Sequence, residues 1–472
     1  MEQSALSTRD QGMGLFADLY ELTMAQAFYE HRMFAPATFS LFVRNLPQDR
    51  GYLVSAGLED VLDFLAHFRF DEGGLSYLDS TGIFSREFLG YLEDLRFTGE
   101  VRAIPEGRFF FAHEPVLEVT APIIEAQIVE TFVINQVNLQ TMLATKAARC
   151  AWAAEGRSLS DFSARRTQGT DAAMKMARCA YIAGFESTSN VMAARKYGIP
   201  PAGTMAHSFI TTFPTEIDAF QAYAKSFPDR CVLLLDTYDT VQGAHNAVRV
   251  AEELESRGHR LRAVRLDSGD YADLGRKVRA ILDEAGLQYV SILVSGGLDE
   301  FAVQQLVDNG APIDIFGIGT KVGVAADAPW SDMAYKLVCY DGSPVMKLSA
   351  DKVSHPGAKQ VFRIENPEGM LHHDVIGLQD EEVRGAEPLL EHVMSAGRAI
   401  GAVASLDDMR GRLRRDLERL GNGSRKLTAP SAYPVEFSRR LTTLAAQVRH
   451  DLEGSIWSSG RVGPNSTGRS VK

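Results

Sequence analysis

Four short apolar runs, each ending on a small or acidic residue, constrain the fold of this chain more than any other feature of its sequence. They are CVLLLDT (231–237), LRAVRLDSGD (261–270), YVSILVSGG (289–297) and IDIFGIGTK (313–321). Amphipathic segments such as 271–285 separate the runs, and repeats of about 30 residues are typical of the βα units of a parallel sheet. Because parallel strands end at one edge of their sheet, Asp236, Asp267, Ser295 and Gly319 are predicted to lie together. In closed (β/α) barrels this edge carries the active site.

The sequence on either side of these units predicts further domains. Residues 1–157 combine amphipathic helix patterns with short strand-like runs, which indicates a separate N-terminal α+β domain. The βα alternation is expected to occupy 158–350 and to include the strand-like run IPPAGT (199–204). A C-terminal segment, 351–457, mixes a strand-like run with a charged helix. The Ser/Gly-rich tail, 458–472, is predicted to be disordered.

The composition excludes several classes of protein. Hydrophobic residues make up 45% of the chain and charged residues 23%, as is usual for a globular protein. The net charge of −12 argues against a nucleic-acid-binding surface, although it leaves room for a local basic pocket that binds phosphate. The four cysteines show no CxxC spacing, which indicates reduced thiols rather than a zinc site or disulfides. With no signal-peptide pattern and no apolar run approaching ~18 residues, the chain is expected to be soluble and cytoplasmic.

The motif RLDSGD (265–270) has the features of a sugar-binding strand end. A carboxylate at Asp267 accepts two hydrogen bonds from vicinal ribose hydroxyls, and the glycine after Ser268 lets the sugar approach the backbone closely. Arg265 lies two residues earlier, hence on the same face of the strand. It is placed to pair with Asp267 or to reach a phosphate. The alternative interpretation is that Asp267 caps the following helix, and the sequence leaves the two equally open.

Two glycine-rich strand ends, VSGGLDE (294–300) and FGIGTK (316–321), each open toward a predicted helix. Backbone N–H groups and the helix dipole at such ends bind phosphate. Neither motif is a Walker A loop, and GIGTKVG departs from the GxGxxG fingerprint by one residue, so a dinucleotide site is not indicated. Two adjacent strand ends of this kind predict one bound phosphate. The residues concerned are Ser295, Gly296, Gly297, Gly317, Gly319 and Thr320.

A histidine and an arginine pair complete the candidate chemistry. A lone histidine is more often structural than catalytic, but His207 follows a strand-like run and has small neighbours that leave its ring accessible. The motif DFSARR (161–166) ends the first predicted strand of the barrel with Arg165 and Arg166. Two adjacent arginines indicate an anion site, because guanidinium matches carboxylate and phosphate geometry. A solvated strand end is the equally weighted alternative.

Taken together, these motifs resemble those of nicotinate phosphoribosyltransferases, over residues 14–440. The resemblance rests on DLYELTM (18–24), YLVSAGLEDVLDFL (52–65), GFESTSNV (184–191), GTMAHSF (203–209), LLLDTYDT (233–240), RLDSGD, FGIGT (316–320) and KLSADKVSHPGAKQVFR (347–363). It implies an α/β fold of the type II phosphoribosyltransferase kind, with an irregular (β/α) barrel and an α+β domain built from the N-terminal and C-terminal segments. It also implies a homodimer that converts nicotinate and phosphoribosyl pyrophosphate into nicotinate mononucleotide and pyrophosphate, for NAD synthesis. ATP is expected as a co-substrate, with Mg²⁺, whose protein ligands the sequence does not indicate.

The resemblance also implies roles for individual residues. His207 stands at the position of the phosphohistidine through which ATP hydrolysis is coupled. Phe162 and Tyr20, the latter contributed by the partner subunit, would clamp the pyridine ring, and Arg165 would serve the pyrophosphate or phosphate region. Arg265 and Asp267 would hold the phosphoribosyl group, whose 5′-phosphate would bind the two glycine-rich loops. Further expected substrate contacts are Arg166, Ser189, Thr204, Asp236 and Ser268.

One position separates acid from amide as substrate. The nicotinamide-using relatives carry an aspartate where this chain has Ser189, and a carboxylate there would repel the carboxylate of nicotinate. A neutral hydroxyl, with Arg165 and Arg166 nearby in sequence, favours the acid. Ser163 stands where a glycine is common and is expected to influence how Phe162 stacks.

Three other functions remain compatible with the sequence. A nicotinamide phosphoribosyltransferase is the nearest, and Ser189 argues against it. A quinolinate enzyme shares the barrel class but needs a second carboxylate site and no phosphohistidine. The third is a catalytically inactive barrel that acts as a binding protein.

Overall fold

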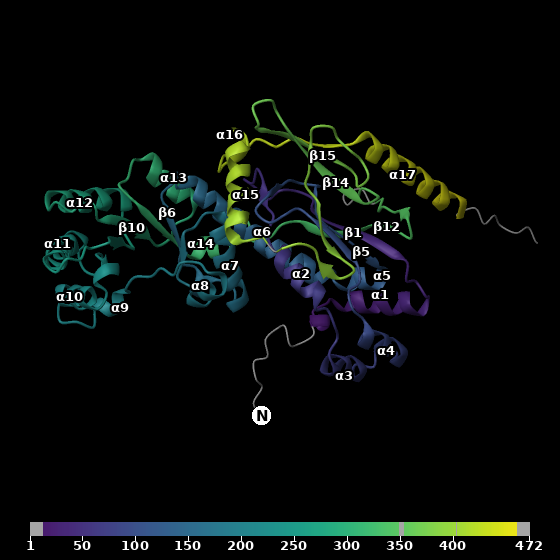
Figure 1. The fold of residues 1–472 in the computed structure, drawn as a ribbon, viewed down its shortest axis with the longest axis horizontal. Helices are drawn as coiled ribbons and strands as arrows, with labels where there is room; N and C mark the ends of the chain where they lie inside the picture. Colours follow the sequence, from purple (N-terminus) through teal and green to yellow (C-terminus); the bar gives the residue numbers. More distant parts are fainter. Residues whose placement is uncertain (1–12, 349–353, 403, 460–472) are drawn as a thin grey trace, which may run out of the picture.

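A computed structural model describes residues 13–348, 354–402 and 404–459 of the chain. The molecule has two lobes, one built on a parallel sheet and the other on mainly antiparallel sheets, with several helices between them (Figure 1). The predicted tail 458–472 lies outside the described residues apart from its first two positions, which end the last helix.

Seven antiparallel strands form the largest sheet, in the order β13-β12-β1-β5-β3-β17-β18. Their bounds are β13 Ser343–Pro344, β12 Met333–Tyr340, β1 Pro36–Val43, β5 Pro115–Pro122, β3 Glu100–Ala103, β17 Glu391–Ser395 and β18 Arg398–Ala399. Strand β17 pairs with β3, so segments from the two ends of the chain share this sheet. Strand β12 falls inside the segment 158–350 that the sequence assigns to the barrel, yet it pairs with β1 along its length. It carries Lys336 at its centre, whereas a strand covered on both faces of a parallel sheet needs a continuous apolar run.

The second sheet has six parallel strands in the order β7-β6-β11-β10-β9-β8 and curls into a half-barrel. The strands are β6 Ser158–Asp161, β7 Ser187–Thr188, β8 Val232–Leu234, β9 Ala263–Leu266, β10 Ser291–Ser295 and β11 Ile315–Ile318. The four apolar runs of the sequence are β8 to β11, which confirms the predicted parallel sheet. The predicted strand at 199–204 is wrong: it forms one isolated bridge, Thr188 to Pro201, because proline has no N–H to donate.

Helices connect the parallel strands, and several of them begin at polar side-chain caps. They are α7 Thr170–Ala183, α8 Val191–Tyr197, α9 His207–Ile210, α10 Glu216–Ser226, α11 Thr240–Ser256, α12 Tyr271–Glu284, α13 Glu300–Asp308, α14 Thr320–Gly323, and the 3-10 turns η2 Ala164–Arg166 and η3 Pro228–Arg230. Asp239, Asp270 and Asp299 accept hydrogen bonds from the first turns of α11, α12 and α13. Such caps each contribute about 1 kcal/mol and fix where each helix starts relative to the preceding strand end.

The remaining elements complete the lobe of the antiparallel sheets. A four-stranded sheet and a two-stranded sheet consist of β16 Glu387–Pro388, β14 Lys359–Glu365, β15 Leu371–Leu378 and β19 Val435–Phe437, and of β2 Leu53–Val54 and β4 Phe109–Phe110. The helices are η1 Met13–Leu15, α1 Leu19–Glu30, α2 Leu58–Ala66, α3 Glu72–Ser80, α4 Arg86–Asp94, α5 Ile123–Ile128, α6 Glu130–Ala153, α15 Leu406–Arg419, α16 Asn422–Arg425 and α17 Arg439–Ser459. Within the described ranges, no helix is long and apolar enough to cross a membrane.

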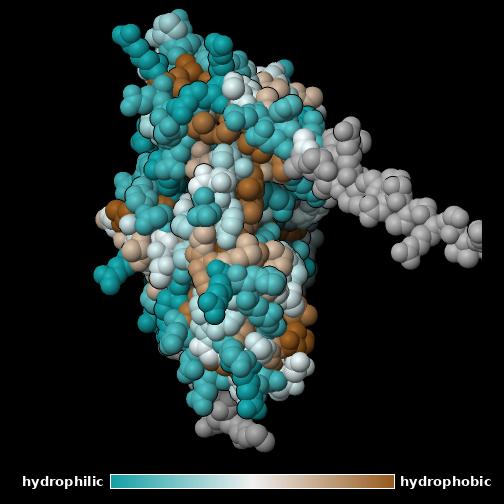
Figure 2. Space-filling view, turned by 90° about the vertical axis from the view of Figure 1, so that its right-hand side faces the viewer, coloured by the Kyte–Doolittle hydropathy of each residue, from teal (hydrophilic) through white to brown (hydrophobic). Residues whose placement is uncertain are grey.

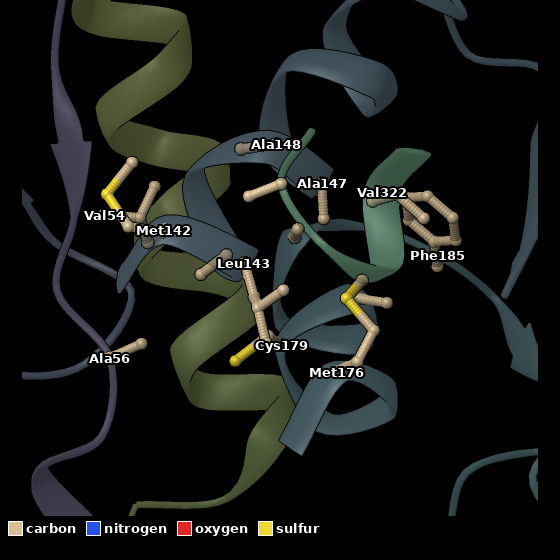
Figure 3. Packing of buried hydrophobic residues seen from close by; sticks show 14 of the residues in the cluster. Val54, Ala56, Met142, Leu143, Ala147, Ala148, Met176, Cys179, Phe185 and Val322 are labelled. Carbon is tan, nitrogen blue, oxygen red and sulfur yellow. The ribbon is translucent and has the colours of Figure 1, made fainter. Parts of the chain in front are cut away.

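Helix α6 joins the two lobes. Figure 3 shows its buried side chains Met142 and Ala147 lying between Val54 of β2 on one side and Val322 of α14 on the other. Helix α6 contacts β2, α2 and β12 as well as α7, α13 and α14. Small residues such as Ala147 and Ala148 allow the close approach of helix backbones. Away from this core, the surface on the side of the antiparallel sheet is mainly hydrophilic, with apolar side chains in small separate groups (Figure 2).

Candidate active site

The guanidinium group of Arg265, on β9, is the centre of a hydrogen-bonded cluster at the carboxyl edge of the parallel sheet. It donates to Asp267 Oδ1 (2.5 Å), to Ser295 Oγ at the end of β10 (2.8 Å), to Thr204 Oγ1 (2.8 Å) and to the carbonyl of Met205 (3.3 Å). The contact with Thr204 is informative, because Thr204 follows the Pro201 bridge to β7, four strands away from β9 in the sheet order. The sheet is therefore curled enough for the side chain of Arg265 to contact both the end of β10 and the segment that follows β7.

The carboxylate of Asp267 is available for chemistry rather than used as a helix cap. Asp270 caps α12 instead, accepting from the N–H groups of Ala272 and Asp273. Asp267 Oδ1 accepts from Ser295 and Arg265, while Oδ2 faces the ring of His207. Burial alone would raise the pKa of Asp267, but the hydrogen bond from Ser295 and the charge of Arg265 outweigh it and hold that pKa below its usual value. The carboxylate is thus negative at neutral pH.

Asp236, at the end of β8, links neighbouring strand ends. Its Oδ2 accepts from the backbone N–H of Asp267 (3.0 Å) and from Ser268 Oγ (2.6 Å). Its Oδ1 is buried and has no hydrogen-bond partner within the described part of the chain. Asp239 caps the next helix, so Asp236, like Asp267, is not needed for capping.

The imidazole of His207 lies beside this cluster at the start of α9. Its Nδ1 is 3.1 Å from Thr237 Oγ1, and its Nε2 is 3.8 Å from Asp267 Oδ2. The side chain is 44% exposed, so a substrate can reach the ring. One ring nitrogen thus lies beside a hydroxyl and the other faces a carboxylate.

The two glycine-rich loops require glycine for steric reasons. Gly296 has φ +93°, and a Cβ there would lie 2.4 Å from the carbonyl oxygen of Asp267. A Cβ on Gly317 would lie 2.5 Å from the ring of Phe162. An ion pair between Lys321, after the second loop, and Asp299, after the first, joins the two loops (2.7 Å). Gly297, Gly319 and Thr320 lie on the same two loops, of which Gly297 and Thr320 are exposed.

Phe162 packs one face of its ring against Gly317 and lies below the guanidinium of Arg265, which is 5.8 Å from the ring centroid. The ring is only partly buried. Next to it, Ser163 is buried and donates its hydroxyl to Asp161 Oδ1, so the serine is held away from the Phe162 ring. Ser189 donates its backbone N–H to the carbonyl of Asp161 (2.8 Å), and its hydroxyl makes no hydrogen bond to the described residues.

Three predicted residues make no hydrogen bond or ion pair with this cluster in the described part of the chain. Arg165 and Arg166 are on η2, with exposed side chains that form no ion pair within the described ranges. Tyr20 lies on α1 in the lobe of the antiparallel sheets, 46% exposed, and α1 is well separated from β10 (Figure 1). A single chain therefore does not bring Tyr20 to the strand ends.

Sequence reasoning missed three residues of the site. Tyr271, at the first position of α12, donates its hydroxyl to backbone carbonyls of both neighbouring strand ends, those of Asp267 and Ser295. Lys321 joins the two glycine-rich loops through its ion pair with Asp299. Asp161, next to Phe162 in sequence, accepts three hydrogen bonds. The tyrosine directly after the RLDSGD motif was the one available signal. The other two depend on contacts across the sheet.

Sequence profiles of one family cover most of the chain. The nicotinate phosphoribosyltransferase N-terminal domain matches residues 15–138, the nicotinate phosphoribosyltransferase family profile 157–352, and the C-terminal domain 383–445. The nicotinate phosphoribosyltransferase pncB2 of Mycobacterium tuberculosis is 49% identical over 94% of this chain and 96% of its own length. The chain belongs to the nicotinate phosphoribosyltransferase family.

Other members of the nicotinate phosphoribosyltransferase family agree in sequence and fold. The nicotinate phosphoribosyltransferase of Bacillus subtilis is 37% identical over 95% of this chain and 97% of its own. The crystal structure of human nicotinic acid phosphoribosyltransferase superposes with a TM-score of 0.83 at 30% identity, covering 91% of this chain and 99% of that one. These likenesses confirm the type II phosphoribosyltransferase fold predicted from the sequence.

Proposed function

We propose that this protein transfers the phosphoribosyl group of phosphoribosyl pyrophosphate to nicotinate, forming nicotinate mononucleotide and pyrophosphate for NAD synthesis, and that ATP hydrolysis drives the reaction through a phosphohistidine at His207. The observation that carries the proposal is the cluster of Arg265, Asp267 and His207 at the carboxyl edge, in a chain of this family. The substrate class comes from the relatives, which are nicotinate phosphoribosyltransferases. The contacts among Arg265, Asp267 and His207 support the roles proposed for these residues.

The proposed transfer is a displacement at C1 of the ribose. The bond from C1 to pyrophosphate breaks as the pyridine nitrogen forms the new bond, and the sugar passes through an oxocarbenium-like state. Asp267 Oδ2, which neither Arg265 nor Ser295 occupies, is available to accept a ribose hydroxyl close to that positive charge. Catalysis by this chain then consists of positioning and electrostatic stabilisation rather than covalent attack on the sugar.

The proposed role of ATP rests on His207. The neutral imidazole attacks the γ-phosphorus through its unprotonated nitrogen, the bond to the β-phosphate oxygen breaks, and ADP leaves. The proton on the other nitrogen remains there. Asp267 lies beside Nε2 of the ring and Thr237 beside Nδ1. Whichever nitrogen keeps the proton therefore has a carboxylate or a hydroxyl beside it, which stabilises the resulting phosphoimidazole. Water later cleaves the P–N bond, which returns neutral His207 and inorganic phosphate.

Asp236 fits a role in holding Mg²⁺. Its Oδ1 is buried without a hydrogen-bond partner among the described residues, and no group of three or more metal-ligating side chains is found in those ranges. Mg²⁺ is commonly held by one or two carboxylates together with substrate phosphates and water. When bound, the ion neutralises charge on a polyphosphate. The free Oδ1 of Asp236 could serve as one such ligand, since Mg²⁺ does not need a full set of protein ligands.

Ser189 and Tyr20 bear on specificity and assembly. The unengaged hydroxyl of Ser189 and the unpaired Arg165 and Arg166 support nicotinate rather than nicotinamide, since no carboxylate occupies the position of Ser189. The exposed Tyr20 lies too far from its own strand ends to clamp the pyridine ring. We therefore include in the proposal a homodimer in which each subunit contributes Tyr20 to the other subunit's site.

The test is pyrophosphate release from phosphoribosyl pyrophosphate, with nicotinate, nicotinamide or quinolinate, each with and without ATP. Turnover of nicotinate that ATP stimulates, with ADP formed, is the expected result. His207→Gln should abolish the ATP stimulation, while the matched control His245→Gln, exposed on α11 of the same lobe, should retain it.

Each other outcome has a definite meaning. Turnover of nicotinamide or quinolinate in place of nicotinate would assign one of the alternative enzymes. Undiminished nicotinate-dependent ATP hydrolysis by His207→Gln would contradict the phosphohistidine. No turnover with any acceptor, together with no calorimetric binding of phosphoribosyl pyrophosphate, would favour an inactive barrel.

A further inference from the structure

Asp161 is a buried carboxylate that no cation of the described chain accompanies. It ends β6 and is 0% exposed. Burial raises its pKa above the usual value in spite of hydrogen bonds from Ser163 and Thr188. Moving a carboxylate out of water without a counter-charge costs several kcal/mol, so the fold alone does not favour an ionisable group here. A neutral or apolar side chain would complete β6 at lower cost.

The hydrogen bonds of Asp161 connect two separate segments. Oδ1 accepts from the backbone N–H of Ser163 (2.9 Å) and from its hydroxyl (2.5 Å), while Oδ2 accepts from the hydroxyl of Thr188 on β7 (2.7 Å). The carbonyl of Asp161 in addition accepts from the N–H of Ser189. One residue thus fixes the segment that carries Phe162 and the segment that carries Ser189.

The direction of these hydrogen bonds requires an acceptor at position 161. Thr188 Oγ1 accepts from the backbone N–H of Asn190 (3.0 Å), the residue that caps α8, so its own proton is available to Asp161. Ser163 likewise offers two protons. A carboxylate accepts all three bonds, whereas an asparagine amide would place N–H donors against the Thr188 hydroxyl. The arrangement therefore depends on a side chain at position 161 that has two acceptor oxygens.

We infer that Asp161 is a positioning residue for the pyridine substrate, which holds Phe162 and Ser189 at a fixed separation through Ser163 and Thr188 and thereby sets the preference for acid over amide. The inference rests on the proposed function, because Phe162 and Ser189 are the residues assigned there to the pyridine ring and its substituent. Asp161 itself, with no exposed surface, does not touch the substrate.

The test compares Asp161→Asn with the wild-type enzyme in steady-state kinetics. Loosening the two segments should raise the KM for nicotinate about tenfold, with kcat and the KM for phosphoribosyl pyrophosphate changed less than about threefold, because only pyridine binding is affected. The ratio of kcat/KM for nicotinate to that for nicotinamide should fall. Asp314→Asn is the matched control: Asp314 accepts a backbone N–H at the opposite end of the sheet, and its variant should keep wild-type kinetics.

A second variant carries the test if Asp161→Asn does not fold. Thr188→Val removes one donor to Asp161 at nearly constant volume and should raise the nicotinate KM in the same selective way. A nicotinate KM within twofold of wild type in the folded variants, or an equal loss for both substrates that follows the folded fraction, would overturn the inference and leave the proposed function intact. A wild-type protein that does not use nicotinate would instead refute the proposed function and the inference with it.

Discussion

Replacing Arg265 by lysine should separate the hydrogen-bonding geometry of the strand-end cluster from its charge. The guanidinium donates to Asp267, Ser295, Thr204 and the carbonyl of Met205 at once. A lysine keeps the positive charge but has a single nitrogen on a flexible stem, which cannot reproduce the planar fork. It is expected to retain the contact with Asp267 and to lose those with Ser295 and Thr204.

The magnitude follows from the two lost bonds. Hydrogen bonds to a charged group each contribute about 1.5–3 kcal/mol, and water reaching the partly exposed site recovers part of the loss. A net loss of about 3 kcal/mol corresponds to a fall of ~100-fold in kcat/KM for phosphoribosyl pyrophosphate at saturating nicotinate. The KM for nicotinate should change much less, because Phe162 and Ser189 keep their backbone contacts.

The control is Arg279→Lys on α12. Arg279 also donates to a carboxylate and to two backbone carbonyls, those of Asp283, Val290 and Leu287, but it serves the packing of α12 and not the strand ends. Its variant should lose thermal stability and retain kcat/KM. If Arg265→Lys kept kcat/KM within threefold of wild type, or if the two variants lost it equally, the cluster would not have the catalytic role assigned to it.

Three further predictions concern stability and the pyridine site. Glu300→Gln removes one partner of the buried Lys146 and should lower the free energy of unfolding by about 3 kcal/mol in urea titration. Burial and neighbouring positive charge lower the pKa of His355 to about 4, below the ~6.5 of an unfolded chain, so its stabilising contribution is complete above pH 6.5 and is lost as the pH falls toward 4. His355→Gln should therefore flatten the acid loss of stability between pH 7 and 4 by about 2 kcal/mol, measured as a difference from wild type. Gly317→Ala places a methyl group 2.5 Å from the ring of Phe162 and should raise the nicotinate KM at least tenfold in protein that calorimetry shows to be folded.

The carboxyl edge was predictable from the sequence because its residues follow from strand ends, and strand ends follow from apolar runs. Asp236 and Asp267 follow β8 and β9 as the βα rhythm predicts, whereas His207 reaches the same edge from a segment that forms no strand. The choice between Asp267 as ligand and as helix cap was not predictable, since it depends on which aspartate the helix begins after, and Asp270 takes that role. The role of Asp161 was not predictable, because its partners Ser163 and Thr188 lie on two segments that meet only across the sheet. Strand β12 lies inside the segment 158–350 but pairs with β1, and sequence order says nothing about such long-range antiparallel pairing.

Ion pairs connect helix α6 to the segments that follow the two glycine-rich loops. Helix α13 begins just after Gly297, and its first residue, Glu300, is fully buried against Lys146 and Arg149 of α6. Lys146 in turn pairs with Asp327, so the ion pairs connect α6 to chain segments after both glycine-rich loops. Because these ion pairs join α6 to both segments, we expect movement of α6 to displace both loops together. Glu300→Gln should therefore weaken binding of phosphoribosyl pyrophosphate more than it weakens binding of nicotinate, even at temperatures where the variant is fully folded. Equal affinities for both substrates in that variant and in wild type would show that the loops hold their shape without α6.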